Sequence, residues 1–128
     1  MAILEQGLPE GFDLQKESKT KLTYFKGETI FKQDAFAPYI IYIIEGLVKI
    51  TLHTGPGKQI NLRIAKKGDF LALSSIFGEN RYLTSALALT DTQTCMIDKE
   101  SLAKLLKENH ELSLQLSSQN SLQERRMI

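Results

Sequence analysis

The chain is organised around Gly68–Asp98, which has the sequence GDFLALSSIFGENRYLTSALALTDTQTCMID. A Gly-Asp turn opens this stretch, and the apolar run Leu71–Phe77 is predicted to be a short helix that ends at Gly78. After a polar loop, Leu83–Thr90 and Thr92–Ile97 are predicted to be strands, because branched and alternating residues lie on either side of a tight turn. The stretch is therefore expected to hold a turn, a helix and two strands.

The segments upstream of this stretch are predicted to be strands separated by glycine turns. Tyr39–Ile44 holds six consecutive large residues, all β-branched or aromatic, which is typical of a strand buried on both faces. Leu47–His53 alternates with period 2 instead, so one set of its side chains is expected to face the core. That inward set is Val48, Ile50 and Leu52. Ile60–Ala65 also alternates and is predicted to be the hairpin partner across a Gly-Pro-Gly turn.

Helices are predicted downstream of the last strand. Asp98 is a suitable N-cap for a helix that begins at Lys99, and this helix has an apolar stripe at positions i, i+3 and i+4. The stripe consists of Leu102, Leu105 and Leu106. Asn109 could cap a second helix, which would begin at His110 and run to the end of the chain. Its thinner apolar stripe consists of Leu112, Leu116 and Leu122.

The fold class predicted by this order of elements is mainly β. Many short strands with glycine turns, followed by helices at one end, indicate a double-stranded β-helix (jelly-roll) barrel with flanking helices. The length of 128 residues is that of one ordinary domain. No apolar run approaches the ~20 residues that a membrane-spanning helix needs, so we expect no membrane partner.

Charge and cysteine content exclude several classes of protein. The formal net charge is +1, from 16 basic and 15 acidic residues, whereas a nucleic-acid-binding domain usually has a strongly basic surface. Cys95 is the one cysteine, which excludes an internal disulfide and a CxxC metal site. A free cysteine favours a reducing compartment, so we expect a cytoplasmic protein in which Cys95 is a small buried strand residue.

Catalytic and metal-binding groups are not apparent. The two histidines, His53 and His110, lie on different predicted elements, and a cupin-type metal site needs H-x-H with a glutamate and a third histidine. His53 lacks that second histidine and is expected at the surface of its strand. The chain also lacks a Ser/His/acid grouping for nucleophilic catalysis. We therefore predict no catalytic residues, no metal, no cofactor and no enzymatic activity.

Four segments resemble, in order and spacing, the motifs of a known family. Phe25–Phe31 is similar to the family's first glycine turn, and Tyr42–Lys49 to its F-I-x-x-G-x-V-K strand pair. Gly68–Phe70 resembles the opening of its phosphate-binding cassette, and Ser85–Thr92 its S-A-x-A-x-T-D-T block. The family is the cyclic-nucleotide-binding-domain superfamily. Within it, the chain resembles CRP/FNR-type bacterial transcription regulators over about residues 20–128.

This resemblance implies a division of the chain. Family members have an eight-stranded jelly-roll barrel, bind an effector between the barrel and a dimerisation helix, and continue into a helix-turn-helix domain that reads DNA. Residues 1–108 would be the sensor domain and residues 109–128 the start of the C-terminal dimerisation helix. The helix-turn-helix domain would be missing, through natural truncation or because the chain is an expressed fragment. We expect a homodimer with an unknown small-molecule effector, which contacts DNA only through that missing domain.

The resemblance also locates the site at which members of the family hold a cyclic nucleotide. They use a Gly-Glu pair after G-D-x-x for the ribose, and an Arg followed by Ser or Thr for the phosphate. Counting from Gly68 puts Ala72 and Leu73 at the Gly-Glu pair. Counting from either side of the loop puts Leu83 or Thr84 at the arginine. Because these positions supply neither carboxylate nor cation, we predict weak or no binding of cyclic AMP or cyclic GMP.

Nearby residues leave alternatives open. Arg81 could supply the missing charge, or it could be a solvated loop residue. Neighbouring hydroxyl groups could form a polar cluster for a neutral or weakly anionic ligand, or they could cap local backbone groups. They belong to Ser74, Ser75, Thr84 and Ser85. Leu73 and Leu83 could instead fill the pocket, which would make the domain a degenerate sensor.

Two functional hypotheses follow. The first is an effector-sensing, cyclic nucleotide-binding-like domain of a CRP/FNR-family transcription regulator, with a degenerate phosphate-binding cassette. The alternative is a stand-alone jelly-roll (cupin-like) enzyme or a scaffold that does not bind DNA. The parent gene beyond Ile128 discriminates between them, since a helix-turn-helix there supports the first and a stop codon supports the second.

Overall fold

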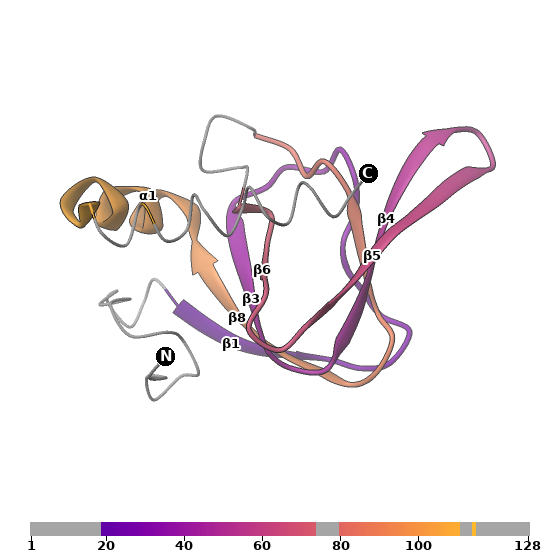
Figure 1. Ribbon diagram of the computed structural model, residues 1–128, viewed down its shortest axis with the longest axis horizontal. Coiled ribbons are helices and arrows are strands. Elements are labelled where there is room, and N and C mark those ends of the chain that lie inside the picture. The colour runs from indigo at the N-terminus through magenta and orange to yellow at the C-terminus, as the bar shows by residue number, and fades with distance from the viewer. Residues whose placement is uncertain (1–18, 74–79, 111–113, 115–128) are drawn as a thin grey trace.

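The computed structural model describes residues 19–73, 80–110 and 114. Within these residues eight strands precede one helix (Figure 1): β1 (Lys19–Tyr24), β2 (Thr29–Phe31), β3 (Tyr39–Glu45), β4 (Leu47–Gly55), β5 (Lys58–Lys66), β6 (Phe70–Leu71), β7 (Ser85–Ala88), β8 (Thr92–Asp98) and α1 (Lys99–Glu108). The strands form two antiparallel sheets of four, in the orders β1-β8-β3-β6 and β2-β7-β4-β5. This mainly β architecture with a C-terminal helix is consistent with the predicted jelly roll.

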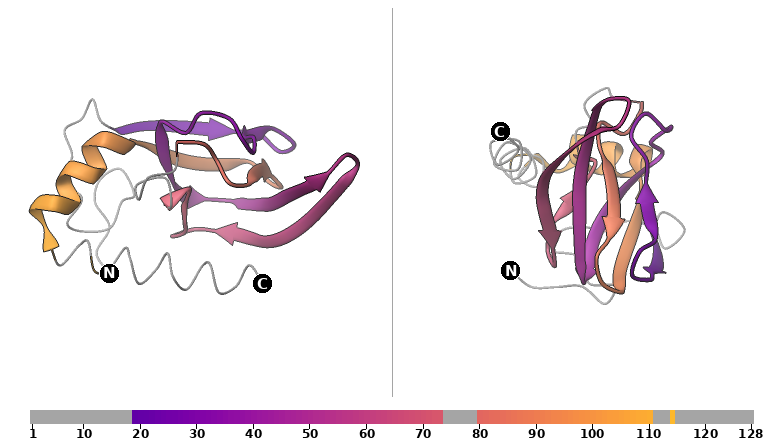
Figure 2. Two further views of the ribbon diagram at one scale, coloured as in Figure 1. Left: turned by 90° about the horizontal axis from the view of Figure 1, so that it is seen from above. Right: turned by 90° about the vertical axis from the view of Figure 1, so that its right-hand side faces the viewer.

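The two sheets share one apolar cluster, and α1 covers a second. Seen from above, β1 and β8 lie on one side of the molecule and the β4–β5 hairpin on the other, with α1 at the end remote from the hairpin tip (Figure 2). The inter-sheet cluster consists of Ile30, Phe31, Ala37, Ile41, Ile43, Val48, Ile50, Ala65, Leu71, Tyr82, Ala86 and Ala88. The helix-facing cluster consists of Ile40, Tyr42, Phe70, Leu73, Cys95, Ile97, Leu102 and Leu106. The first sheet is therefore covered on both faces.

Strand β3 is buried on both faces, as its unbroken apolar run predicts. Ile41 and Ile43 belong to the inter-sheet cluster, while Ile40 and Tyr42 face α1. Successive side chains of a strand point to opposite faces, so a strand between two apolar layers needs large apolar residues at every position. The two ends of the strand depart from this pattern: Tyr39 and Glu45 are exposed and Ile44 is half-buried.

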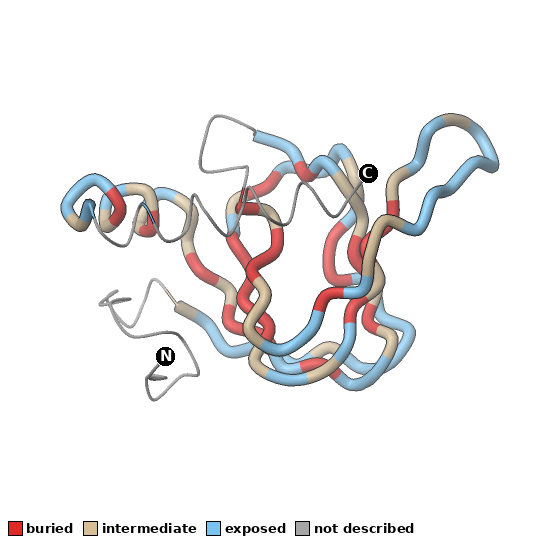
Figure 3. The backbone as a smooth tube through the Cα atoms, in the orientation of Figure 1, coloured by how far each residue is buried: buried red, intermediate tan, exposed pale blue. Residues whose placement is uncertain are grey.

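The β4–β5 hairpin confirms the predicted pairing and corrects the predicted inner face. Val48 and Ile50 point inward, but the register shifts between Ile50 and Thr51, so Thr51 is buried and Leu52 is only half-buried. A β-bulge of this kind interrupts the simple alternation of a strand. Beyond the bulge, the hairpin tip extends into solvent (Figure 3).

Two further elements of the central stretch differ from prediction. The predicted helix does not begin at Leu71, because Leu71 pairs with Ile41 of β3 and ends β6. Residues 74–79 lie outside the described residues. The predicted strand at Leu83–Thr90 is shorter, spanning Ser85–Ala88 as β7, in which the buried side chains are Ala86 and Ala88. By contrast, β8 begins at Thr92 as predicted.

Helix α1 begins and ends at polar caps. The Asp98 carboxylate accepts the backbone N–H of Ser101 at 2.9 Å and its hydroxyl at 2.8 Å, which confirms the predicted N-cap. Leu102 and Leu106 are buried against the first sheet, so this stripe is confirmed as well. Asn109 is the C-cap of α1, because its N–H donates to the Leu105 carbonyl, and the chain is helical again at His110.

The second predicted helix lies mostly outside the described residues. His110 and Leu114 are helical, and Leu114 is exposed. The three leucines of the predicted stripe are not described; they are Leu112, Leu116 and Leu122.

Candidate functional site

The two residues at the predicted Gly-Glu positions face different layers of the molecule. Ala72 follows β6, adopts a φ of +66° and packs against the inter-sheet cluster. Leu73 is 2% exposed and lies in the helix-facing cluster with Leu102. Ala72 therefore borders the interior between the sheets, whereas Leu73 supports α1. Ser74 and Ser75, which the polar-cluster hypothesis includes, lie outside the described residues.

The residues predicted on the other side of the loop lie mainly at the surface. Arg81 is exposed, and its guanidinium Nη1 donates to the Asp34 carbonyl at 2.6 Å. Leu83 is 51% exposed and Thr84 is half-buried. The Ser85 hydroxyl accepts the backbone N–H of Gln33 at 2.9 Å. The structure thus places Leu73 and Leu83 in different environments, one buried and one exposed.

Arg81 borders a cavity of about 710 Å³ beside the start of α1. Its other lining residues are Phe36, Ala37, Pro38, Asn80, Asp98, Lys99 and Glu100. Arg81 forms an isolated backbone bridge with Phe36, and the Lys99 ammonium donates to the Asn80 side-chain carbonyl at 3.4 Å. The lining of this cavity carries two basic side chains and two acidic ones, so the charges around it balance.

The Gly-Asp turn that opens the predicted cassette is anchored to the centre of the first sheet. The N–H of Gly68 donates to the Ile43 carbonyl at 2.9 Å, and the Ile43 N–H donates to the Asp69 carbonyl at 3.0 Å. Gly68 has a φ of +92°, a conformation that favours glycine. The Asp69 carboxylate closes the turn by accepting the Lys66 N–H at 2.9 Å. The turn therefore holds the end of β5 against β3.

Arg63 is a charged residue near this turn that sequence reasoning missed. Its guanidinium Nη1 lies 3.6 Å from the Asp69 carboxylate, and the two side chains are only 12% and 18% exposed. The same carboxylate acts on Tyr42: burial first, and then Asp69, raises the pKa of the Tyr42 hydroxyl. The sequence contains one indication that Arg63 faces inward. Arg63 lies on the same face of its strand as Ala65, and the small side chain of Ala65 suits a packed interior.

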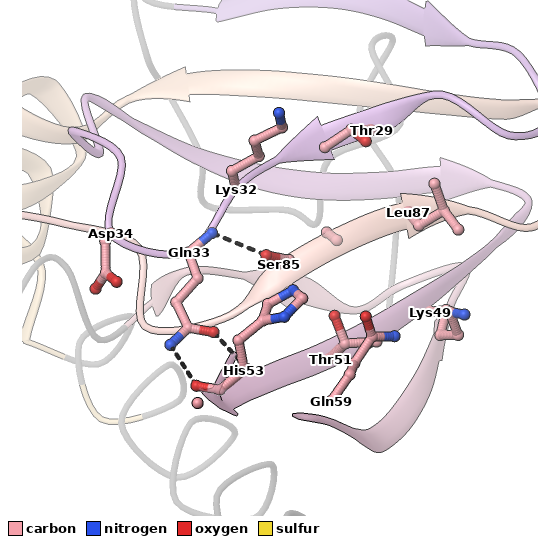
Figure 4. Close-up of a pocket in the computed structure, with 12 residues that line it drawn as sticks. Thr29, Lys32, Gln33, Asp34, Lys49, Thr51, His53, Gln59, Ser85 and Leu87 are labelled. Carbon is pink, nitrogen blue, oxygen red and sulfur yellow. Dashed lines mark hydrogen bonds between the residues drawn. The ribbon is translucent and has the colours of Figure 1, made fainter. Parts of the chain in front are cut away.

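The outer face of the second sheet carries a polar groove of about 740 Å³ (Figure 4). Its lining residues are Thr29, Lys32, Gln33, Asp34, Lys49, Thr51, His53, Gly55, Gln59, Ser85, Ala86 and Leu87. The Gln33 side chain bridges to the backbone of His53, accepting its N–H at 2.8 Å and donating to its carbonyl at 3.1 Å. His53 is exposed, as predicted. The groove offers hydroxyl, amide and ammonium groups that can hydrogen-bond a polar ligand.

The model of one protein family matches residues 21–109, and its description is "Cyclic nucleotide-binding domain". The chain belongs to this family. Among curated proteins, this cyclic nucleotide-binding domain is 31% identical over 105 residues to the anaerobic regulatory protein of Bacillus subtilis strain 168. That match covers 81% of this chain and 44% of the relative, so the chain spans less than half of the relative's length. The similarity places the domain with the CRP/FNR type of regulator.

Solved structures share the fold of this cyclic nucleotide-binding domain. The sensor domain of the transcriptional regulator DNR from Pseudomonas aeruginosa is 25% identical with a TM-score of 0.73, over 83% of this chain and 71% of that one. The catabolite activator protein of Thermus thermophilus has a TM-score of 0.77 at 23% identity, over 91% of this chain and 55% of that one. The two-sheet architecture is thus that of known bacterial regulators.

The described part of this cyclic nucleotide-binding domain contains neither a cluster of metal ligands nor a membrane-spanning helix. Within residues 19–73, 80–110 and 114, no three His, Cys, Asp or Glu side chains lie close enough together to hold a metal ion. In the same residues, no helix has the length and apolarity to cross a membrane. Cys95 is buried in β8, and burial raises the pKa of its thiol, so it behaves as a small core residue.

Proposed function

We propose that this cyclic nucleotide-binding domain is the effector-sensing module of a CRP/FNR-type transcription regulator. Its Bacillus subtilis relative is a regulatory protein, and the similar domain from Pseudomonas aeruginosa is the sensor domain of a transcriptional regulator. Because the chain covers only 44% of the curated relative, the DNA-binding function would belong to a further domain. The near-zero net charge of +1 supports this division of labour.

The effector that we propose is not cyclic AMP or cyclic GMP. The observation that carries this proposal is the position of Leu73, where cyclic-nucleotide-binding members would have a ribose-binding glutamate. Leu73 is 2% exposed beneath α1, so hydrocarbon replaces a hydrogen-bond acceptor there. At the two positions counted for the phosphate arginine, Leu83 and Thr84 carry no charge. A phosphodiester bound at these positions would lack its charge-assisted partners.

Calorimetric titration of the 128-residue chain with cyclic AMP and with cyclic GMP tests this proposal. We expect no saturable binding at micromolar concentrations. Thr84→Arg restores a cation at a half-buried candidate position, and it should raise the affinity for either nucleotide by about tenfold or more if the missing charge is the reason. Thr23→Arg, an exposed β1 variant, is the charge-matched control and should change nothing. Micromolar binding by the unmodified chain would overturn the proposal.

The assembly that we propose is a cytoplasmic homodimer formed through residues 109–128. The helical conformation of His110 and Leu114 supports a helix in this region, and the free Cys95 supports a reducing compartment. Leu112, Leu116 and Leu122 would make the contact between the two copies.

Sedimentation velocity with Leu116→Ser tests the dimer. We expect the unmodified chain to sediment as a dimer, and Leu116→Ser to weaken the dimer by about tenfold, as is typical when an apolar anchor of an interface is removed. Leu114→Ser is the matched control, because this exposed leucine lies outside the predicted stripe. A monomer at high concentration, or an equal loss with Leu114→Ser, would contradict the proposed interface.

A further inference from the structure

The polar groove of Figure 4 has a floor built from two cross-strand rows of the second sheet. In the first row, Leu87 of β7 lies opposite both Thr29 of β2 and Lys49 of β4. In the next row, Ser85 of β7 lies opposite Thr51 of β4. Residues opposite each other in a sheet share a face, and so do residues two positions apart in one strand. Three strands therefore contribute side chains to the same groove.

A bridge between β4 and the segment after β2 closes one end of the groove. The pairing of β4 with β7 ends at Thr51, so the backbone of His53 has no strand on that side. The Gln33 amide takes the place of a strand, because it accepts the His53 N–H at 2.8 Å and donates to the His53 carbonyl at 3.1 Å. The Gln33 N–H donates in turn to the Ser85 hydroxyl at 2.9 Å. These hydrogen bonds hold the groove in shape before a ligand arrives, which lowers the entropic cost of binding.

The groove carries an excess of positive charge. Its basic side chains are Lys32 and Lys49, and Asp34 is the one carboxylate among the described residues that line it. Lys49 is half-buried in the floor, where its charge attracts an anion more strongly than the charge of a fully solvated lysine does. The cavity beside the start of α1 has balanced charges instead. Of these two cavities, the groove is therefore the one that favours an anion.

The other polar groups of the groove can both donate and accept hydrogen bonds. They are the hydroxyls of Thr29, Thr51 and Ser85, the His53 imidazole and the Gln59 amide. Thr51 is 5% exposed and yet lines the groove, so the part of it that solvent reaches faces the groove. Among the described lining residues, His53 has the one aromatic ring, which offers little surface on which a nucleobase could stack. Such a lining suits ligand hydroxyl groups, which also donate and accept.

We propose that this groove binds a small anion that carries several hydroxyl groups, either a sugar phosphate or a sugar acid. The Lys49 ammonium holds the anionic group, while Thr51 and Ser85 exchange hydrogen bonds with the ligand hydroxyls. The volume of about 740 Å³ lies within the range of about 300–1,000 Å³ that is typical of small-molecule sites. This inference goes beyond the proposed function, because the groove lies on the outer face of the second sheet, whereas the cassette positions pack against the apolar clusters.

Nuclear magnetic resonance of the 128-residue chain tests the groove with three probes. Ribose 5-phosphate and gluconate are the charged probes, and ribose is the neutral one. The imidazole signals of His53 are followed at constant pH and ionic strength, and His53→Gln identifies which of the two sets of histidine signals they are. We expect a saturable shift with at least one charged probe below about 10 mM, and weaker binding of ribose. Binding of ribose 5-phosphate alone, gluconate alone or both would each support the site and would identify the anionic group that it accepts.

Two variants with matched controls locate the binding. Lys49→Gln removes the charge in the floor and should weaken binding of the charged probe by about tenfold. Lys21→Gln removes an exposed charge from β1 and should leave binding unchanged. Thr51→Val removes the hydroxyl with little change in size and should weaken binding by about three- to tenfold. Its control is Thr23→Val, at an exposed position of β1.

Three outcomes would overturn the proposal. The first is the absence of a saturable shift with either charged probe. The second is equal affinity for ribose and the charged probes, which would show that the groove does not select an anion. The third is an equal loss of binding in Lys49→Gln and Lys21→Gln, which would show that binding depends on the net charge of the chain rather than on the groove.

Discussion

The two sheets of this molecule are built from similar numbers of apolar residues but use them differently. The first sheet lies between the second sheet and α1, and its strand β3 is apolar at consecutive positions from Ile40 to Ile43. The second sheet packs on one face only. Its outer face carries Lys49, His53 and the groove of Figure 4. Burial on one face or two therefore determines whether a strand alternates or runs apolar throughout.

The difference extends to residues that look equivalent in the sequence. Leu102 of α1 is fully buried against the first sheet, whereas Ile64 of β5 is 57% exposed on the second. Both are large, branched and apolar. Their contribution to stability depends on the layer that covers them, because only area removed from water stabilises the fold.

The largest effect that we predict tests this contrast directly. Leu102→Ala should lower the free energy of unfolding by about 2–5 kcal/mol, since it leaves a cavity between α1 and the first sheet. Ile64→Ala, the matched control on the second sheet, should change it by about 0.5 kcal/mol or less. Urea unfolding followed by circular dichroism measures both. Equal losses would mean that α1 does not protect the first sheet in solution.

The prediction with the next largest effect concerns the packing of Tyr82 in the interior between the two sheets. Tyr82 lies in the inter-sheet cluster, where its ring stacks on Phe31 at a centroid distance of 4.2 Å. Burial is the main reason that the pKa of its hydroxyl rises to about 12 from an ordinary value of 10.0. The native state therefore holds this proton more tightly than the unfolded state. Its contribution to stability is complete below pH 10 and is lost as the pH rises toward 12.

Tyr82→Phe makes this pH dependence measurable. Between pH 8 and pH 11 the unmodified protein should lose about 1.4 kcal/mol more unfolding free energy than the variant, which has no hydroxyl to ionise. Urea unfolding at both pH values provides the comparison, and Tyr39→Phe, an exposed residue, serves as the matched control. The same alkaline loss in unmodified protein and Tyr82→Phe would show that Tyr82 is not held between the sheets as described.

Much of the fold could be predicted from local patterns in the sequence. The apolar run of β3, the pairing of β4 with β5, the last strand and the Asp98 cap were all predicted and confirmed. Each depends on residues close together in the chain. The failures arose at Leu52, where a bulge changes the alternation, and at Leu83, where a predicted strand position is exposed.

The candidate site was less predictable than the fold. Counting along the cassette found Ala72 and Leu73 but not that they face different layers of the molecule. Counting could not find Arg63, because this residue lies in β5, outside the cassette. Its side chain approaches Asp69 only because the turn after β5 brings the two residues together in the folded chain. A sequence motif specifies how far apart residues lie along the chain. The position of a charged residue on a neighbouring strand depends instead on how that strand pairs with the rest of the sheet.

The sequence by itself determined the type and order of the elements, because alternation, caps and turns depend on backbone geometry over a few residues. The tertiary structure decided which of the two faces of β5 is the inner one. A period of 2 offers both faces equally, and pairing with Ile50 and Val48 selected the face that holds Arg63 and Ala65. What counts as inside is set by the layer packed against a strand, and that layer comes from distant parts of the chain.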